Sequence, residues 1–340
     1  MLQFSKKVNI IIPSINFSKE LEYCLIKLNK QTYKNFFVTV VLNKKSNKRL
    51  SNNVFNYKLN VLYVKKNNMS YKRNFAAKKY KSDLIAFIDS DTYCHENWLN
   101  NAVSIILKKG DKTIVGGPNI PFPNQTYQEI LCYYAKRSFF VTGYLNFRKF
   151  KSKNRYCDWL ESCNIIMVRN FFLSNGGMNE KLYLGEDKEF QERFKKNDSS
   201  TKIFFSNKLY IFHKERNLLK FLLQRFVFGT DLFNITGFEK KIVPYQPVLP
   251  ICIFFGFISL FFLDLSISIK FLIISILALI VQTLILLNVS KYLNDFKKLF
   301  LVTIIINLAN LAYAFGGLVR ILHIHNIIRR KLYLKSRNNF

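Results

Sequence analysis

The N-terminal part of the chain alternates between short apolar runs and segments with helical spacing. Four runs are apolar enough to form buried strands: Val8–Ile12, Phe36–Leu42, Val61–Val64 and Leu84–Ile88. Ser18 and Ser70 each stand before a helical pattern and can cap a helix, the second of which runs through Tyr80. Strands that alternate with helices in this rhythm predict a doubly wound, mostly parallel α/β sheet with helices on both faces.

The pattern is less regular in the middle of the chain. The expected elements are a helix after Trp98, a strand at 113–116 that ends in a Gly-Gly bend, a strand at 163–169, a helix from Glu186, and short strands at 203–205 and 209–212. The segment from about 120 to 155 has no clean period, so we expect loops and short helices there that shape a cleft.

Apolar residues gather in the last third of the chain. The runs Val248–Leu263, Phe271–Val289 and Leu299–Val319 lack full charges and approach the roughly 20 residues that a bilayer helix needs. Before them, 217–236 is apolar but interrupted by charges, which is typical of helices in a membrane interface. We therefore expect a globular domain over 1–215, an interfacial amphipathic segment over 216–246, a membrane region over 247–320 with two to three transmembrane helices, and a basic tail over 321–340.

Charge and cysteine content narrow the possible partners. The formal net charge is +31, which suits nucleic acid or an anionic membrane surface. Lys and Arg are scattered rather than interleaved with stacking aromatics, so we expect a membrane and no nucleic acid. No signal peptide is recognised, which predicts a cytosolic first domain. The six Cys form no CxxC pair, so reduced and mostly buried thiols are expected rather than zinc ligands or disulfides.

Two carboxylates follow the apolar run Leu84–Ile88 directly, in Asp89-Ser90-Asp91. Ligands of such sheets bind beyond the carboxyl ends of the strands, where this motif is expected to lie. Carboxylates two positions apart can approach one hard cation such as Mg²⁺ or Mn²⁺, and this ion would neutralise a departing diphosphate. The alternative is that both aspartates only cap the next helix or form a turn.

Four stretches occur in an order that resembles the family 2 glycosyltransferases of the GT-A fold, over about residues 6 to 215. They read "VNIIIPSIN", "KQTYKNFFVTVVLN", "SYKRNFAAKKYKSDLIAFIDSDTYCHENWL" and "GGMNEKLYLGEDKEFQERFKK". The C-terminal stretches "RFVFGTD" and "NLANLAYAFGGLVRIL" are similar to the membrane-associated subgroup that builds bacterial exopolysaccharide. The resemblance implies a Rossmann-like GT-A domain followed by transmembrane helices, in a multi-pass protein of the cytoplasmic (inner) membrane.

The resemblance also implies a role for individual residues. Asp91 would bind the metal, Asp89 would lie near the donor ribose or the metal, and His213 near the metal or diphosphate. In the Glu186-Asp187 pair, Asp187 would be the general base. The implied donor-binding residues are Pro13, Asn16, Asn43, Arg73, Asn74, Asp89 and Arg225. The structural alternatives are a surface arginine, an acidic first helical turn and a packed histidine.

One departure from the family pattern affects the donor. Where relatives read "VVDDGS" or "VVDNGS", this chain has Val40-Val41-Leu42-Asn43-Lys44. The usual aspartate partner of a uracil ring is missing, and Asn43 can replace only some of its hydrogen bonds. The donor base stays open, with a UDP-sugar as the first choice.

The resemblance implies an inverting hexosyltransferase that depends on Mn²⁺ or Mg²⁺. It would move a sugar from a nucleotide diphosphate donor to a glycan or lipid-linked acceptor in cell-surface polysaccharide synthesis. Two other functions stay open: a non-catalytic membrane scaffold with the same fold, and a membrane-bound nucleotidyltransferase.

Overall fold

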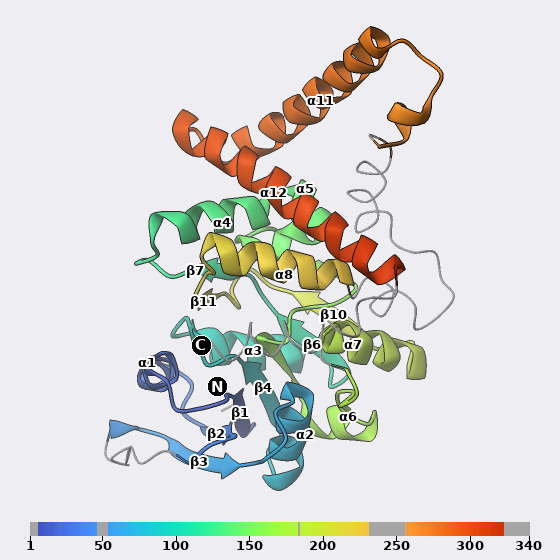
Figure 1. Cartoon of the computed structure of the whole chain (residues 1–340). Coiled ribbons are helices and arrows are strands. Elements are labelled where there is room, and N and C mark those ends of the chain that lie inside the picture. The colour runs from blue at the N-terminus through green and yellow to red at the C-terminus, as the bar shows by residue number, and fades with distance from the viewer. Residues whose placement is uncertain (1–5, 46–53, 183, 231–255, 257, 323–340) are drawn as a thin grey trace. The chain divides into compact units, whose positions relative to one another are not determined.

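The computed structural model describes residues 6–45, 54–182, 184–230, 256 and 258–322 (Figure 1). The chain divides into two compact units. The first comprises residues 1–122 and 148–214, and the second comprises 123–147 and 215–340. The first unit contains the described strands, and the second is helical.

The first unit is built on an eight-stranded sheet with the order β3-β2-β1-β4-β9-β6-β10-β8. The strands are β1 Val8–Pro13, β2 Phe36–Leu42, β3 Lys58–Tyr63, β4 Leu84–Ile88, β6 Thr113–Gly116, β8 Arg155–Tyr156, β9 Asn164–Val168 and β10 Lys202–Phe205. The pairs from β3 through β2 and β1 to β4 are parallel, as is β6 with β10. Strand β9 is antiparallel to β4 and β6, and β8 is antiparallel to β10. The mostly parallel α/β sheet predicted from the sequence is confirmed.

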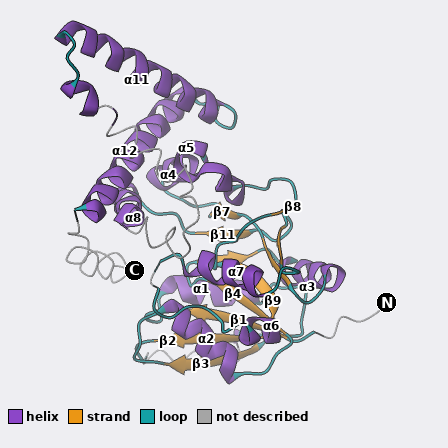
Figure 2. Cartoon of the chain, turned by 90° about the vertical axis from the view of Figure 1, so that its right-hand side faces the viewer, coloured by secondary structure: helices purple, strands orange, loops and turns teal. Residues whose placement is uncertain are grey.

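Helices cover both faces of this sheet (Figure 2). They are α1 Lys19–Leu28, α2 Met69–Lys79, α3 Trp98–Lys109, α6 Arg169–Ser174 and α7 Glu186–Asn197. Helices α1 and α3 share one apolar core with alternate strand residues such as Ile10 and Val38. On the opposite face Phe87 of β4 packs against Phe172 of α6, with ring centroids 5.3 Å apart. Burial on both faces explains why these strands are continuous apolar runs.

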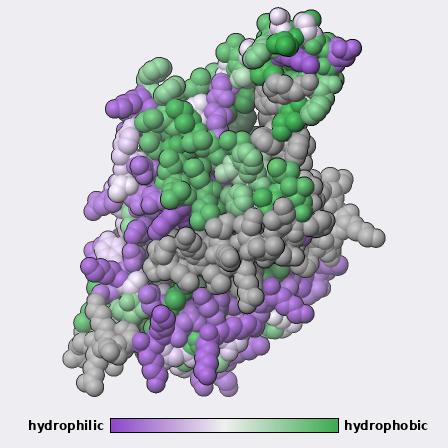
Figure 3. Space-filling model, viewed as in Figure 1, coloured by the Kyte–Doolittle hydropathy of each residue, from purple (hydrophilic) through white to green (hydrophobic). Residues whose placement is uncertain are grey.

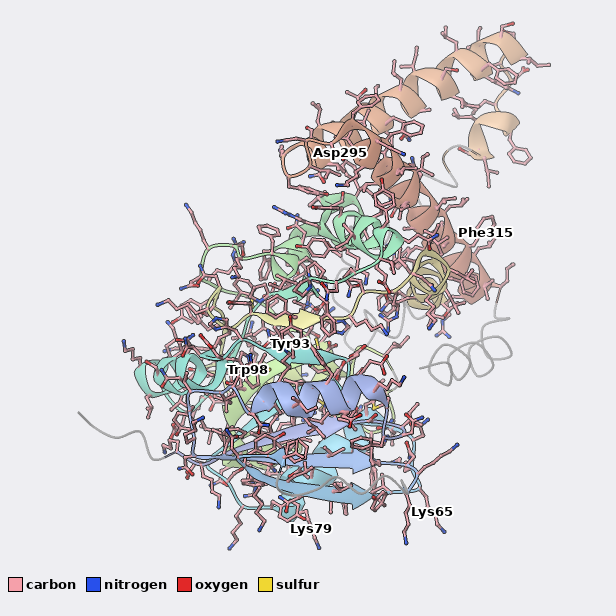
Figure 4. The ribbon with its side chains drawn as sticks, turned by 90° about the vertical axis from the view of Figure 1, so that its left-hand side faces the viewer. Lys65, Lys79, Tyr93, Trp98, Asp295 and Phe315 are labelled. Atoms are coloured by element: carbon pink, nitrogen blue, oxygen red, sulfur yellow. The ribbon has the colours of Figure 1, made fainter. Side chains whose placement is uncertain are left out.

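A second, three-stranded sheet has the order β5-β11-β7, with β5 Thr92–Cys94, β7 Asn119–Pro121 and β11 Ile211–His213. Strand β11 is antiparallel to β5 and parallel to β7. The rings of Tyr93 and Phe212 stack across the β5–β11 pair at 4.5 Å. Figure 4 labels Tyr93 with Trp98, the first residue of α3, and shows Lys65 and Lys79 extending from the surface of this unit.

One local expectation was wrong. Ser18 does cap α1, but α2 is capped by Asn68, whose side chain accepts the Tyr71 N–H at 2.8 Å. Asparagine is as good an N-cap as serine, so the helix begins before Ser70, which is buried in its first turn. The segment from about 120 to 155, expected to form loops and short helices, does contain short helices, of which α4 Tyr127–Arg137 begins with a capping box of Thr126 and Glu129.

The second unit contains α4, α5 Phe139–Thr142, α8 Leu218–Thr230, α11 Ile267–Ser290 and α12 Phe296–Ile321. The 3-10 helix η2 Gly143–Lys149 carries the chain from this unit to the first, and η3 Leu260–Phe262 precedes α11. Helices α8 and α12 approach so closely at Gly229 and Gly316 that an added Cβ at either would meet backbone. Helices α11 and α12 are joined by Gln282 and Asn307, whose side-chain amides exchange two hydrogen bonds of 2.9 and 3.2 Å.

Among the described residues, two helices are long and apolar enough to cross a membrane: Ile267–Ser290 and Phe296–Arg320. Only 11% of the most apolar window of α11 is buried by the rest of the protein. Figure 3 shows hydrophobic side chains over much of the surface formed by the helices of this unit, and Figure 4 labels Phe315, which is exposed on α12. Most of the apolar run Val248–Leu263, residues 231–236 and the basic tail from 323 lie outside the described residues.

Candidate active site

The site is built around the carboxyl end of the buried strand β4. Asp89 follows β4 directly, and its carbonyl oxygen accepts hydrogen bonds from the Thr92 amide at 3.3 Å and the Thr92 hydroxyl at 2.7 Å. This tight turn leads at once into β5. The side chains of Asp89 and Asp91 are 38% and 25% exposed, so both carboxylates border the solvent.

The register of two antiparallel strand pairs brings further side chains to this turn. Ile88 of β4 pairs with Asn164 of β9, which sets Cys163 beside Asp89. In the smaller sheet Thr92 pairs with His213, and the Lys214 amide donates to the Asp91 carbonyl at 3.0 Å. As a result, one ligand atom each from Asp89, Cys163 and His213 lie within 4.8 Å of one another. We call these three residues the Asp–Cys–His group.

The donor atoms of this group fit a divalent cation. Carboxylate, imidazole and sulfur are all ligands of first-row transition metals. Nδ1 of His213 lies 2.8 Å from the Lys214 carbonyl oxygen, which can only accept, so Nδ1 carries the proton and Nε2 is left with its lone pair. Asp91 is outside the group, but its Oδ1 lies 3.8 Å from Nε2 of His213.

Arg73, on α2, connects the strand end to the Glu186-Asp187 turn. Its side chain is only 2% exposed; Nη2 donates to Asp89 Oδ1 at 2.7 Å, and Nη1 lies 3.7 Å from Glu186 Oε1. The two acidic motifs therefore share one guanidinium. Its Nε and Nη1 are buried and have no hydrogen-bond acceptor among the described residues.

Asp187 lies in the first turn of α7, which follows Gly185 with φ +72°. Its carboxylate accepts the Lys188 amide at 2.9 Å and the Ser162 amide at 3.4 Å. Burial, and then the adjacent negative charge of Glu186, raise the pKa of Asp187 to about 7. A carboxylate with this pKa can accept a proton near neutral pH.

Glu161 is a neighbour of this site that no sequence motif indicated. Although burial opposes its ionisation, the charges of Lys149 and Arg148 lower the pKa of Glu161 to about 2. Lys149 Nζ lies 2.8 Å from the carboxylate and Arg148 Nη2 lies 3.7 Å from it. The cationic pair comes from η2 and its end, in a segment whose elements the sequence pattern left undefined.

The predicted donor-binding residues beside β1 and β2 are partly engaged within the protein. Asn43 accepts a hydrogen bond from Lys72 Nζ at 2.6 Å and donates to the Val64 carbonyl at 3.0 Å. Lys72, buried on α2, also donates to the Ser14 carbonyl at 2.6 Å. Pro13 ends β1, and Asn16 is exposed just beyond it. No sequence motif indicated Lys72, because its role depends on contacts with Ser14 and Asn43 that only the fold creates.

The amide of Asn74 holds the loop before α7. It donates to the Met178 carbonyl at 2.8 Å and accepts the Met178 amide at 2.9 Å. Gly177 has φ +67°, and a Cβ added there would lie 2.6 Å from Asn74 Oδ1. Arg225 belongs to the second unit, where its guanidinium lies 4.6 Å from the Tyr313 ring centroid. A donor-binding role for Arg225 stays a prediction.

A mostly parallel sheet with two aspartates at the end of β4 is the arrangement expected of a GT-A glycosyltransferase. Comparison with known proteins supports this class. Residues 9–165 match the family described as glycosyl transferase family 2, so the chain carries a glycosyltransferase domain of this family. The match includes Arg73, Asp89, Asp91 and Cys163. The family resemblance read from the sequence is confirmed, while the exopolysaccharide subgroup stays a prediction. No curated protein matches the sequence.

Solved structures match this chain at low sequence identity, and the fold is shared with the first one named here. The mannosyltransferase PcManGT from Pyrobaculum calidifontis, in complex with GDP-Man and Mn²⁺, is 14% identical over 92% of this chain and 87% of that chain, with a TM-score of 0.56. TarS 1-349 of S. aureus is 17% identical over 93% and 92%, with a TM-score of 0.45. GalNAc-T7 with UDP, GalNAc and Mn²⁺ is 14% identical over 62% of this chain and 43% of that chain, with a TM-score of 0.47.

Proposed function

We propose that this chain transfers a sugar from a nucleotide diphosphate donor to a hydroxyl of a glycan or lipid-linked acceptor. The carrying observation is the buried Arg73 guanidinium, which is bonded to Asp89 and lies 3.7 Å from Glu186. This guanidinium places a positive charge for the donor phosphates beside the Glu186-Asp187 pair, which can supply a general base. The complex of the mannosyltransferase with GDP-Man and Mn²⁺ supports this donor and metal class.

The donor diphosphate would lie beyond the end of β4. The positive charge of Arg73, held at this strand end by Asp89, would attract the donor phosphates. Asp89, Asp91 and His213 would hold Mn²⁺ or Mg²⁺, which when bound neutralises charge on the leaving diphosphate. A UDP-sugar is our first choice of donor. The base is open because Leu42 replaces the aspartate that relatives offer to uracil, and Asn43 already accepts a hydrogen bond from Lys72.

Asp187 would act as the general base. It takes the proton of the acceptor hydroxyl while that oxygen forms a bond to the anomeric carbon. The bond from this carbon to the diphosphate oxygen breaks on the opposite side, the bonding electrons leave with the phosphate, and the configuration inverts. Glu186, held near Arg73, would keep the base oriented at the start of α7.

We further propose that the second unit anchors the enzyme in a membrane. Helices α11 and α12 are long and apolar enough to span it. The catalytic domain would face the cytosol of a bacterial cell, and the segment over 216–246 that follows it in the sequence would bind lipid head-groups. A lipid-linked acceptor for cell-surface polysaccharide fits this arrangement.

The test is a panel assay with the purified full chain in detergent. Each nucleotide sugar is supplied with Mn²⁺ and an extract of lipid-linked acceptors, and release of nucleoside diphosphate is measured. We expect one donor to be turned over and Asp91→Asn to reduce that turnover about 100-fold or more, as loss of a metal ligand does. Release of inorganic diphosphate would indicate a nucleotidyltransferase. Absence of both turnover and calorimetric binding of UDP or GDP with Mn²⁺ would indicate a scaffold.

A further inference from the structure

The metal group contains a sulfur atom that the sequence motifs did not indicate. We propose that Cys163 is a thiolate ligand of the bound cation, so that the site prefers Mn²⁺, Co²⁺, Zn²⁺ or Cd²⁺ to Mg²⁺. This inference rests on the metal site of the proposed function. It adds a ligand and a metal preference to that site.

The position of the sulfur follows from the sheet. Cys163 comes directly before β9 and faces Asp89 because Ile88 and Asn164 are paired in the antiparallel β4–β9 ladder. Its Sγ lies within 4.8 Å of ligand atoms of both Asp89 and His213. A cation bonded to the other two residues would therefore have the sulfur within or close to its coordination sphere.

The hydrogen bonding around the sulfur favours a ligand role. Glu161, which is ionised at neutral pH, can only accept, so the amide nitrogen of Asn119 faces it. The same nitrogen lies 3.2 Å from Cys163 Sγ. The sulfur thus accepts an N–H bond, as metal-bound thiolates do. Oδ1 of Asn119 has no hydrogen-bond partner in the described part of the chain, so the contacts of its nitrogen with Glu161 and Cys163 hold this side chain in place.

The competing role for Cys163 is a neutral thiol that fills space beneath Asp89. Burial, and then the carboxylate of Asp89, keep the pKa of this thiol well above its usual range, so it is protonated when no cation is bound. A cation would replace this proton, which leaves to solvent, and would take the sulfur as thiolate. The two roles differ in whether a metal–sulfur bond forms.

A sulfur ligand has a direct consequence for metal choice. Mg²⁺ requires oxygen ligands in near-ideal octahedral geometry, whereas thiolate favours softer ions. Along the divalent series Co²⁺ and Zn²⁺ also bind N/O/S sites more tightly than Mn²⁺. We expect Co²⁺ and Cd²⁺ to bind the full chain at least about tenfold more tightly than Mg²⁺, in line with the usual effect of one added ligand interaction.

The experiment uses Co²⁺ as the probe because a thiolate bonded to this ion gives a charge-transfer absorption in the near ultraviolet. Co²⁺ is titrated into purified full chain in detergent, and binding is followed in parallel by calorimetry. We expect the band in the wild type, its loss in Cys163→Ser, and its retention in Cys157→Ser. Cys157 is a matched control because it is a partly buried cysteine of the same unit outside the Asp–Cys–His group.

Each outcome decides the proposal. Co²⁺ binding by calorimetry without the band, no Co²⁺ binding at all, or a band that persists in Cys163→Ser would overturn it. If Cys163→Ser fails to fold by circular dichroism, the wild-type band and a Cd²⁺ preference of at least about tenfold over Mg²⁺ carry the decision. Turnover of a nucleotide sugar with Mn²⁺ but no band would leave the proposed function standing and remove only the sulfur ligand. A band without any turnover would support the sulfur ligand and remove the proposed function.

Discussion

At the residue scale, two neighbouring carboxyl groups of this site have very different pKa values because their surroundings differ. Glu161, between Lys149 and Arg148, has its pKa lowered to about 2, whereas burial and Glu186 raise the pKa of Asp187 to about 7. Such a separation assigns chemical roles: a permanently ionised group organises its surroundings, and a group that titrates near neutrality exchanges protons. Asp187 is therefore the best candidate for a base that acts at physiological pH.

The pH dependence of transfer tests this assignment. Asp187 must be deprotonated to accept a proton, so kcat is expected to rise with pH through about 7 and to level off above it. Removing the neighbouring charge with Glu186→Gln should move the rise to lower pH, because a like charge raises the pKa. Single-turnover rates measured across this pH range would reveal both effects. If the pH–rate profile of Glu186→Gln is the same as that of the wild type, the charge of Glu186 does not raise the pKa of Asp187.

Replacement of the base separates chemistry from binding. Asp187→Asn is expected to retain donor affinity by calorimetry and to lose about 100-fold or more of the transfer rate. The native state holds the Asp187 proton more tightly than the unfolded chain, so ionisation of this group costs stability as pH rises towards about 7. The variant should thus unfold at the same or a higher temperature than the wild type at pH 8. Transfer at the wild-type rate would assign the base elsewhere.

At the element scale, two pairings and one helix start position the site. Register in the β4–β9 and β5–β11 pairs sets Cys163 and His213 around the turn at Asp89. Helix α2 carries Arg73, and its N-cap Asn68 also donates to the carbonyls of Glu180 and Leu182 at 3.1 and 3.3 Å. One side chain therefore fixes both the start of α2 and the loop that leads to the Glu186-Asp187 turn.

Asn68 and Ser70 offer a matched test of that helix start. Asn68→Ala removes the cap and both loop contacts, and is expected to destabilise the protein by about 1–3 kcal/mol. Ser70→Ala should change stability by less than about 0.5 kcal/mol, because the buried Ser70 hydroxyl has no hydrogen-bond partner among the described residues. Thermal unfolding in detergent measures the stability of both variants. If the two substitutions destabilise the protein equally, Asn68 is not the only residue that caps α2.

At the scale of the whole molecule, a hydrophilic α/β unit is combined with an apolar helical one. The second unit has its own core, which joins α4, α8, α11 and α12. Its polar contacts include the hydrogen bond between Ser138 and Asn288 at 2.8 Å. Many large hydrophobic side chains of α11 are exposed, which fits lipid better than water.

Membrane extraction tests the role of α11. The wild-type chain is expected to stay in the membrane fraction after an alkaline carbonate wash. Leu279→Lys together with Leu284→Lys should increase the extracted fraction, because Lys near the centre of a spanning helix costs about 2.5–3.5 kcal/mol per residue. Leu107→Lys is the control, since Leu107 is 40% exposed on α3 in the first unit. Complete extraction of the wild type would rule out a spanning α11.

The sequence alone determined the longer strands of the main sheet, most of the helices and the acidic strand end, but not the short strands β5, β7 and β8. Burial on both faces leaves a continuous apolar run such as Phe36–Leu42, and its end marks where β2 stops. The Asp89-Ser90-Asp91 and Glu186-Asp187 motifs are local, so they could be found by reading along the chain. Ser70 was mistaken for the cap because two good capping residues stand two positions apart.

Only the tertiary structure decided which distant side chains meet. Cys163 and His213 come to Asp89 through strand register, a long-range property that no local pattern carries. The same holds for Arg73, which bridges Asp89 and Glu186, and for the charges that separate the pKa values of Glu161 and Asp187. Hydrophobic periodicity reports whether a residue is buried, but proton affinity and metal preference depend on neighbours that are brought together only when the sheet is assembled.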